Sequence, residues 1–223
     1  MGYAALFSGG KDSSLAIWKA QNDELEVEYL VTVYPENDAS YMFHKPNLHI
    51  VPELAESLEI DLVSIESTGE KEEELKDLKG GLEALDIEGV ITGAVASNYQ
   101  LKRIKKIAED LDIEIYAPLW NISQESLLNE LTNNGFRSII VSVSARGLDE
   151  EWLGRSIDKK CIEKLKRLEE RYGINISGEG GEYESLVLGA PNYKWGFEIQ
   201  EKHTSWQGRR GIMNIEKIEK KKK

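Results

Sequence analysis

The chain has 223 residues and a mass of 25.2 kDa, which is enough for one large α/β domain or for a medium domain with a smaller one. Its 28 Lys and Arg against 40 Asp and Glu give a net charge of −12, which argues against binding nucleic acid mainly through phosphate contacts. The single cysteine, Cys161, excludes a disulfide framework, a CxxC redox pair and a thiolate-rich metal site. Its apolar stretches are far shorter than the roughly 20 residues that span a bilayer, and the N-terminus lacks a signal-peptide pattern, so we expect a soluble, cytoplasmic protein.

Short apolar runs alternate with amphipathic stretches in the first half of the chain. Runs rich in β-branched or aromatic residues predict strands at residues 3–7, 27–33, 62–65, 90–92 and 113–116. Apolar residues at steps of three and four predict helices at residues 13–21, 47–58, 70–85 and 99–111. The Gly80-Gly81 pair predicts a bend or break in the third helix. Repeated β–α–β units imply a doubly wound parallel five-stranded sheet with helices on both faces, and we expect the strand order 3-2-1-4-5.

The pattern changes after Pro118. Helices are predicted at residues 123–133 and 158–172, and strands at 138–144, 184–188, 197–199 and 211–218. We therefore expect an α/β domain over residues 1–122 and a smaller α+β domain over residues 123–223. The four lysines at residues 220–223 predict a frayed, solvated tail, because like charges repel one another.

A glycine loop, Ser8-Gly9-Gly10-Lys11-Asp12-Ser13, directly follows the first predicted strand and opens the first helix. Such a loop presents backbone N–H groups and a helix N-terminus to an anion. It lacks the spacing of a Walker A loop and of a dinucleotide fingerprint. It resembles instead the PP-loop of the N-type ATP pyrophosphatases, which cleave ATP between the α and β phosphates. A plain strand-to-helix turn with a Ser or Asp cap is the alternative.

The PP-loop resemblance implies a role for each residue of the loop. Gly9 and Gly10 would let the backbone approach the phosphates, Lys11 would add a fixed positive charge, and the Ser8 and Ser13 hydroxyls would donate hydrogen bonds. Asp12 would contact Mg²⁺ or cap the helix. The need for Mg²⁺ is inferred from phosphate chemistry rather than from a cluster of ligands.

Two further segments narrow the reaction. Residues 93–100 (GAVASNYQ) follow the fourth strand and lie on the same carboxyl edge of the sheet as the PP-loop. Residues 178–185 (GEGGEYES) form a dense glycine–carboxylate loop ahead of a strand. Together with the PP-loop they resemble the diphthine–ammonia ligase family over nearly the whole chain, with further similarity at residues 36–44, 117–120, 147–154 and 186–191. Gly189 departs from the family pattern, in which we expect an acidic residue.

The resemblance implies a fold of the adenine-nucleotide α-hydrolase (HUP) type and an ATP-dependent amidation. The carboxylate of diphthine, a modified histidine on translation elongation factor 2, would be adenylated, and ammonium would then replace AMP to give diphthamide. The nucleotide would be bound by residues 8–13 and Gly93. The catalytic groups would be Lys11, Asp12, Glu179, Glu182 and Glu184. The substrate would be bound by Tyr41, His44, Ser97, Tyr99, Gln100, Gly180, Gly181, Tyr183 and Ser185. A short chain rich in Lys, Glu and Ile favours an archaeal source.

These residue types suit the reaction. A carboxylate can bind ammonium and accept its proton, and aromatic rings bind the trimethylammonium group that diphthine carries. The candidate rings are Tyr41, Tyr99, Tyr183 and Trp120. Structural interpretations stay open: the carboxylates of residues 179–184 can decorate a surface turn, Tyr41 and Trp120 can pack in the core, and His44 can be a structural histidine.

Other functions remain as alternatives. A transfer-RNA-modifying PP-loop enzyme would need a basic face, and thiolation usually needs more than one cysteine. A glutamine-dependent amidotransferase would need a glutaminase domain, for which 223 residues leave no room. A non-catalytic sensor of ATP or AMP would leave the carboxylate-rich loop unexplained. We expect no stable nucleic-acid or membrane partner, and the sequence leaves open whether the chain is a monomer or a homodimer.

Overall fold

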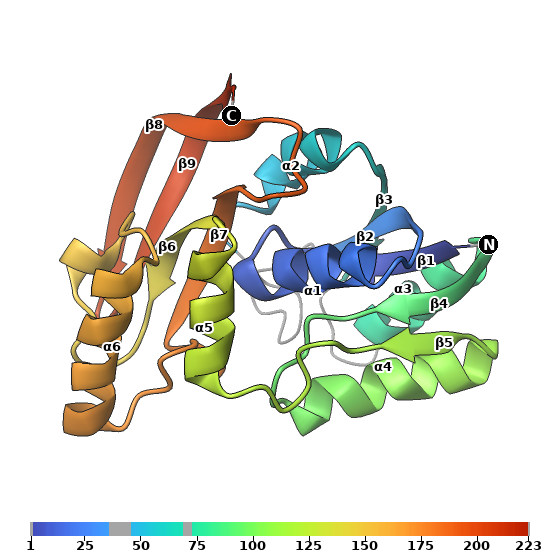
Figure 1. The fold of residues 1–223 in the computed structure, drawn as a ribbon, viewed down its shortest axis with the longest axis horizontal. Helices are drawn as coiled ribbons and strands as arrows, with labels where there is room; N and C mark the ends of the chain where they lie inside the picture. The colour runs from blue at the N-terminus through green and yellow to red at the C-terminus, as the bar shows by residue number, and fades with distance from the viewer. Residues whose placement is uncertain (1, 36–45, 69–72, 223) are drawn as a thin grey trace. The chain divides into compact units, whose positions relative to one another are not determined.

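The computed structural model of the chain describes residues 2–35, 46–68 and 73–222. It contains two compact units (Figure 1). The first comprises the chain up to Ser8 together with Asp12–Trp120, and the second comprises Gly9–Lys11 together with the chain from Asn121 onward. The boundary near residue 122 that the sequence suggests stays a prediction.

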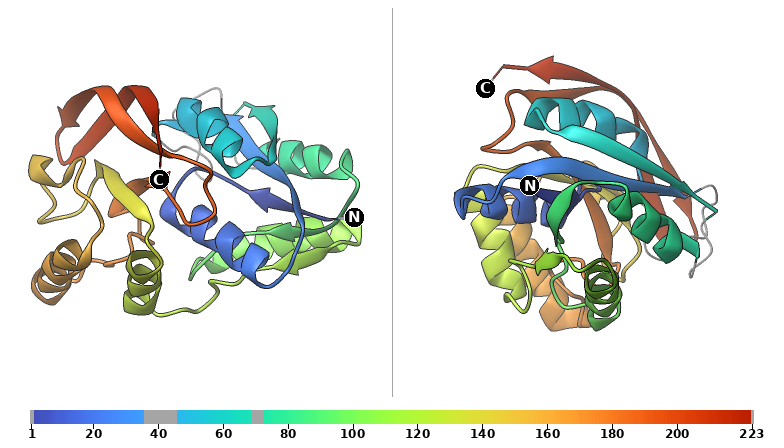
Figure 2. Two further views of the ribbon diagram at one scale, coloured as in Figure 1. Left: turned by 45° about the horizontal axis from the view of Figure 1, so that its top comes forward. Right: turned by 90° about the vertical axis from the view of Figure 1, so that its right-hand side faces the viewer.

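The first unit contains a parallel five-stranded sheet with the strand order β3-β2-β1-β4-β5, which confirms the predicted sheet and its order. Its strands are β1 (Gly2–Leu6), β2 (Val27–Pro35), β3 (Asp61–Ser67), β4 (Ile87–Ile91) and β5 (Glu114–Tyr116). Its helices are α1 (Lys11–Asn22), the short 3₁₀ helix η1 (Leu48–Ile50), α2 (Val51–Leu58), α3 (Glu73–Glu83) and α4 (Asn98–Leu111). Figure 2 shows helices on both faces of this sheet.

The apolar stripes predicted from three- and four-residue spacing form the core of this unit. Leu78 and Leu82 of α3 and Ile104 of α4 are buried with strand residues such as Val31 and Val90. Burial of each such side chain contributes about 1.5–3 kcal/mol. This packing fixes the carboxyl edge of the sheet, at which α/β proteins bind their ligands.

Of the predicted bend or break at Gly80-Gly81, the break is wrong, because α3 runs through both residues without interruption, and the bend stays a prediction. Gly81 faces strand β3 so closely that a Cβ there would lie 2.2 Å from Cδ1 of Ile65, whereas a Cβ at Gly80 would meet no atom within 4 Å. The helix therefore tolerates the glycine pair because Gly81 permits close packing on the sheet, which offsets the low helix propensity of glycine.

The second unit contains an antiparallel four-stranded sheet with the order β7-β6-β9-β8. Its strands are β6 (Arg137–Val143), β7 (Tyr183–Gly189), β8 (Gly196–Gln207) and β9 (Arg210–Lys221). Its helices are α5 (Gln124–Asn133), the 3₁₀ helix η2 (Glu150–Trp152) and α6 (Lys159–Tyr172). The predicted α+β character of this region is confirmed. Among the residues described in the two units, no helix is both long and apolar enough to cross a membrane.

The β8–β9 hairpin is much longer than the predicted strands at 197–199 and 211–218, and it forms the orange-red ribbon of Figure 1. Residues 200–207 are all exposed, so they carry no alternation of apolar and polar side chains from which a strand could be predicted. The prediction of a frayed tail is wrong for Lys220 and Lys221, because these residues of β9 pair with Phe197 and Gly196 of β8, respectively. The tail predicted beyond them includes residue 223, which lies outside the described residues.

Candidate functional site

The glycine loop connects the buried strand β1 to helix α1. Gly9 has a φ of 71°, a left-handed conformation that glycine adopts without strain. The backbone N–H of Ser8 donates to Oγ of Ser13, and the two serine hydroxyl oxygens lie 3.4 Å apart. The predicted phosphate-binding hydroxyls are therefore gathered at the first turn of α1, where the helix N-terminus favours an anion.

The middle of the glycine loop contacts strand β7 within the second unit. The N–H of Val187 donates to the carbonyl of Gly9 at 2.9 Å, and the N–H of Lys11 donates to Oγ of Ser185 at 3.2 Å. The Lys11 ammonium lies 5.6 Å from the centroid of the Tyr183 ring, and the Lys11 side chain is only 3% exposed. Because alternate residues of a strand share a face, Tyr183 and Ser185 reach the loop from one side of β7.

Gly93 lies against the same helix start within the first unit. A Cβ on Gly93 would lie 2.8 Å from the carbonyl carbon of Asp12 and 2.8 Å from the nitrogen of Ser13. Only glycine fits this approach without a shift of backbone. The structure therefore brings Gly93 together with Asp12 and Ser13, three of the residues predicted to bind nucleotide.

The segment after Gly93 leads into α4. Oγ of Ser97 accepts a hydrogen bond from the N–H of Gln100 at 3.3 Å and so caps the helix. The guanidinium of Arg103 lies 3.6 Å from the centroid of the Tyr99 ring. One face of this predicted substrate-binding ring is therefore covered by a cation. Arg103 was not among the predicted site residues, although its i, i+4 spacing from Tyr99 could have indicated the pair.

The glycine–carboxylate loop is held together by its own backbone and by Glu182. The two carboxylate oxygens of Glu182 accept hydrogen bonds from the N–H groups of Asn175 and Gly180, each at 2.9 Å. Gly178 and Gly181 both have a φ of 80°, which allows the tight turns of the loop. These hydrogen bonds of Glu182 therefore order the loop, and Glu179, Glu182 and Glu184 are all partly buried.

The start of β7 continues this ordering toward the glycine loop. The hydroxyl of Tyr183 donates to the carbonyl of Ile176 at 2.9 Å, and Tyr183 is 3% exposed. Its ring is fixed at one end by this hydrogen bond and presents its face to Lys11. Tyr183 is thus a buried support for the lysine. The substrate roles of Glu179, Gly180, Gly181, Glu182, Glu184 and Ser185 stay predictions.

Two predicted site residues, Tyr41 and His44, lie outside the described residues. Trp120 is half-buried.

Burial raises the pKa of the Cys161 thiol to about 11, so this cysteine is an unreactive, packed side chain at neutral pH.

The described residues contain no group of three or more His, Cys, Asp or Glu side chains that could hold a metal ion. Mg²⁺ bound with a nucleotide needs only one or two carboxylates, because phosphate oxygens and water supply its other ligands. Asp12, in the first turn of α1, is the carboxylate of the glycine loop and fits that requirement.

Comparison with known proteins adds to this geometry. The family model described as the diphthamide synthase N-terminal domain matches residues 1–115, and the model of the diphthamide synthase C-terminal domain matches residues 123–221. Mouse and rat proteins named diphthine–ammonia ligase are each 32% identical to this chain, with 87% of this chain and 81% of each relative covered. A solved structure described as a predicted subunit of a tRNA methyltransferase from Methanocaldococcus jannaschii has a TM-score of 0.48 and 18% identity, covering 86% of this chain and 98% of its own.

Proposed function

The chain belongs to the diphthamide synthase family, and we propose that it is the ligase that amidates the diphthine side chain of translation elongation factor 2, with ATP and ammonium as co-substrates. The observation that carries this proposal is the contact between the two motifs. The N–H of Lys11 donates to Oγ of Ser185, and the N–H of Val187 donates to the carbonyl of Gly9. A phosphate loop that touches the strand next to a carboxylate-rich loop suits a reaction that joins nucleotide cleavage to ammonium chemistry.

The proposed reaction has two steps. A carboxylate oxygen of diphthine attacks the α-phosphorus of ATP, and the bond to the β-phosphate oxygen breaks, which yields an acyl-adenylate and pyrophosphate. Ammonium then gives up a proton, and the resulting ammonia attacks the acyl carbon. AMP leaves with the electron pair of the acyl–oxygen bond, and loss of a second proton gives the amide diphthamide.

The PP-loop would stabilise the first step. Its backbone N–H groups and the Lys11 charge would stabilise the negative charge that grows on the departing pyrophosphate, and preorganised donors of this kind contribute strongly to catalysis. Mg²⁺, held by Asp12 and the phosphates, would neutralise phosphate charge. The Lys11 side chain is buried against Tyr183, which favours a fixed position for its charged Nζ.

The second step needs a carboxylate that binds ammonium and accepts its proton. Both oxygens of Glu182 accept backbone hydrogen bonds, which supports a role for Glu182 in positioning the loop. Glu179, Glu182 and Glu184 all stay candidates for the carboxylate that binds ammonium. Because the proposed substrate is a translation factor, we place the reaction in the cytoplasm.

The proposal is tested by incubating the protein with ATP, Mg²⁺ and ammonium, with and without elongation factor 2 that carries diphthine. AMP and pyrophosphate release is measured, and the modified histidine is followed by mass spectrometry in the same samples. We expect AMP release that depends on the factor and a mass change from acid to amide. ATP binding without turnover on this factor would reject the proposal and favour another adenylation or a nucleotide sensor.

Lys11→Ala is expected to lower factor-dependent AMP release at least about 100-fold, because a donor aimed at the developing charge is lost. Lys19→Ala is the matched control, since Lys19 lies on the same helix, in its last turn, and should keep near-normal activity. Equal loss in both variants would contradict the role assigned to Lys11.

Glu182→Gln is expected to keep ATP binding and to lose amide formation, because one carboxylate oxygen that accepts a backbone hydrogen bond becomes an amide donor. Glu201→Gln, an exposed carboxylate of β8, is the control. Full ligase activity of Glu182→Gln would contradict the positioning role proposed for Glu182.

A further inference from the structure

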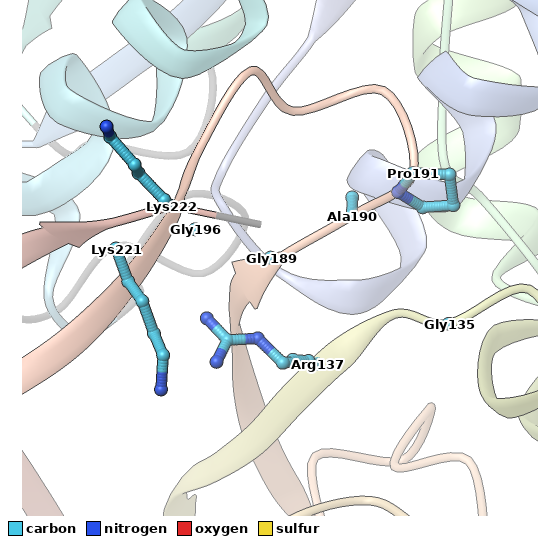
Figure 3. Close-up of a pocket in the computed structure, with 8 residues that line it drawn as sticks. All are labelled: Gly135, Arg137, Gly189, Ala190, Pro191, Gly196, Lys221 and Lys222. Atoms are coloured by element: carbon cyan, nitrogen blue, oxygen red, sulfur yellow. The ribbon is translucent and has the colours of Figure 1, made fainter.

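A pocket of about 380 Å³ lies at one end of the antiparallel sheet in the second unit. It is lined by small residues and by three cations, and none of its lining residues is acidic, although the chain as a whole carries a net charge of −12. Figure 3 shows these lining residues: Gly135, Arg137, Gly189, Ala190, Pro191, Gly196, Lys221 and Lys222. A pocket of this volume is within the range that holds small ligands.

Arg137 is held in a fixed position at the start of β6. Its Nη2 donates to the carbonyls of Leu188 and Phe197, each at 2.9 Å. An arginine has five N–H groups, and the other three, on Nε and Nη1, have no acceptor within the described ranges of the chain. The guanidinium therefore keeps donors for a further oxyanion.

Two glycines make room for this guanidinium. A Cβ at Gly189 would lie 2.9 Å from Nε of Arg137, and a Cβ at Gly196 would lie 2.6 Å from its Nη2. Any larger residue at either position would displace the guanidinium. The glycine at position 189, unexpected from the family resemblance, is thus explained by the space that Arg137 occupies.

Lys221 supplies a second cation and already holds a carboxylate. Its ammonium is ion-paired with Glu198, and both side chains are about half exposed. The hydrogen bond and charge of Lys221, with a smaller contribution from the charge of Arg137, lower the pKa of Glu198. In Figure 3 the Lys221 side chain points toward the side on which Arg137 lies, whereas Lys222 points in the opposite direction. Lys221 and Arg137 therefore both act on the carboxylate of Glu198, and its position suits another oxyanion.

We propose that this pocket binds a phosphate-bearing anion between Arg137 and Lys221, and that Glu198 is the internal counterion that the ligand displaces. A singly charged carboxylate would only replace Glu198 by an equivalent group. A phosphate carries more charge and more acceptor oxygens, so it can engage Lys221 and the remaining donors of Arg137 together. An exposed ion pair such as Lys221–Glu198 is weak, so its displacement costs little.

The test is a titration of the full-length protein with pyrophosphate, without Mg²⁺ and at low salt, followed through the backbone amide resonances of Gly135, Gly189 and Gly196. Resonances of Gly9 and Gly10 report separately on the PP-loop. We expect saturable shifts at the three pocket glycines. Lys221→Gln should weaken this binding about tenfold through loss of a charge-assisted hydrogen bond, and Glu198→Gln should tighten it about fivefold through loss of the competitor.

Lys217→Gln is the matched control, because Lys217 is also an exposed lysine of β9 in an ion pair, with Glu201 at 3.9 Å. It should leave the dissociation constant within about twofold of the wild type. Parallel titrations with AMP and with inorganic phosphate distinguish a nucleotide from a free phosphate as the ligand. The site is supported whichever of these two probes binds more tightly than the other. Succinate that binds as tightly as pyrophosphate, unmoved pocket resonances, or no gain in Glu198→Gln would overturn the proposal.

Discussion

Gly93→Ala gives the sharpest test of the candidate nucleotide site within the first unit. The new Cβ would lie 2.8 Å from both the carbonyl carbon of Asp12 and the nitrogen of Ser13, and 3.0 Å from the carbonyl oxygen of Asp12. All three are backbone atoms of the first turn of α1, so no side-chain rotation relieves the contact. An ordinary contact of 3.4 Å requires a shift of about 0.6 Å, and overpacking of this kind costs about 1–3 kcal/mol.

The same shift would move the N–H groups that we expect to bind phosphate. We therefore expect Gly93→Ala to lose about 1–3 kcal/mol of unfolding free energy in urea and to bind ATP more weakly by calorimetry. Gly80→Ala is the matched control: its Cβ meets no atom within 4 Å, so it should gain about 0.5–1 kcal/mol and bind ATP normally. If Gly93→Ala kept the stability and the ATP affinity of the wild type, the close approach of Gly93 to the first turn of α1 would be refuted.

Two further predictions concern stability. Gly81→Ala should lose about 1–3 kcal/mol in the same urea assay, because its Cβ would lie 2.2 Å from Cδ1 of Ile65; a gain like that of Gly80→Ala would contradict the packing of α3 on β3. Burial raises the pKa of Cys161 from 9.0 to about 11, so the neutral thiol favours the folded state below pH 9 and this contribution is lost as pH rises toward 11. The melting temperature measured between pH 8 and 10 should therefore fall more steeply in the wild type than in Cys161→Ala, and parallel curves would disprove this.

The parallel sheet could be predicted because each of its strands is followed by a helix with a clear apolar stripe. Leu78 and Leu82, or Ile104 and Ile107, recur at helical spacing and are buried where that spacing requires. The β8–β9 hairpin could not be predicted in full, because its pairing rests on backbone hydrogen bonds between residues that are mostly exposed. Local propensity also failed at Gly81, where a tertiary contact with Ile65 outweighs the preference of glycine against helix.

The motifs of the candidate site could be predicted from the sequence, but the contacts between these motifs could not. The order of residues 8–13 after a strand indicates a phosphate loop without any knowledge of the fold. The hydrogen bond from Lys11 to Ser185 joins positions 174 residues apart, and no local pattern specifies such a pair. The same limit applies to Glu182, whose residue type suggests substrate chemistry, whereas its hydrogen bonds to Asn175 and Gly180 depend on how the loop closes.

These long-range contacts give a physical reason why the two motifs act together. Glu182 closes the glycine–carboxylate loop, and the next residue, Tyr183, is anchored by its hydroxyl to Ile176 and presents its ring to the Lys11 ammonium. Two residues further along the same strand, Ser185 accepts the N–H of Lys11. The carboxylate loop is thus linked to the phosphate loop through Tyr183 and Ser185, two alternate residues at the start of β7. We therefore expect Glu182→Gln to disturb the contact between Tyr183 and Lys11 as well as the proposed amide formation, while the backbone N–H groups of the glycine loop still bind ATP.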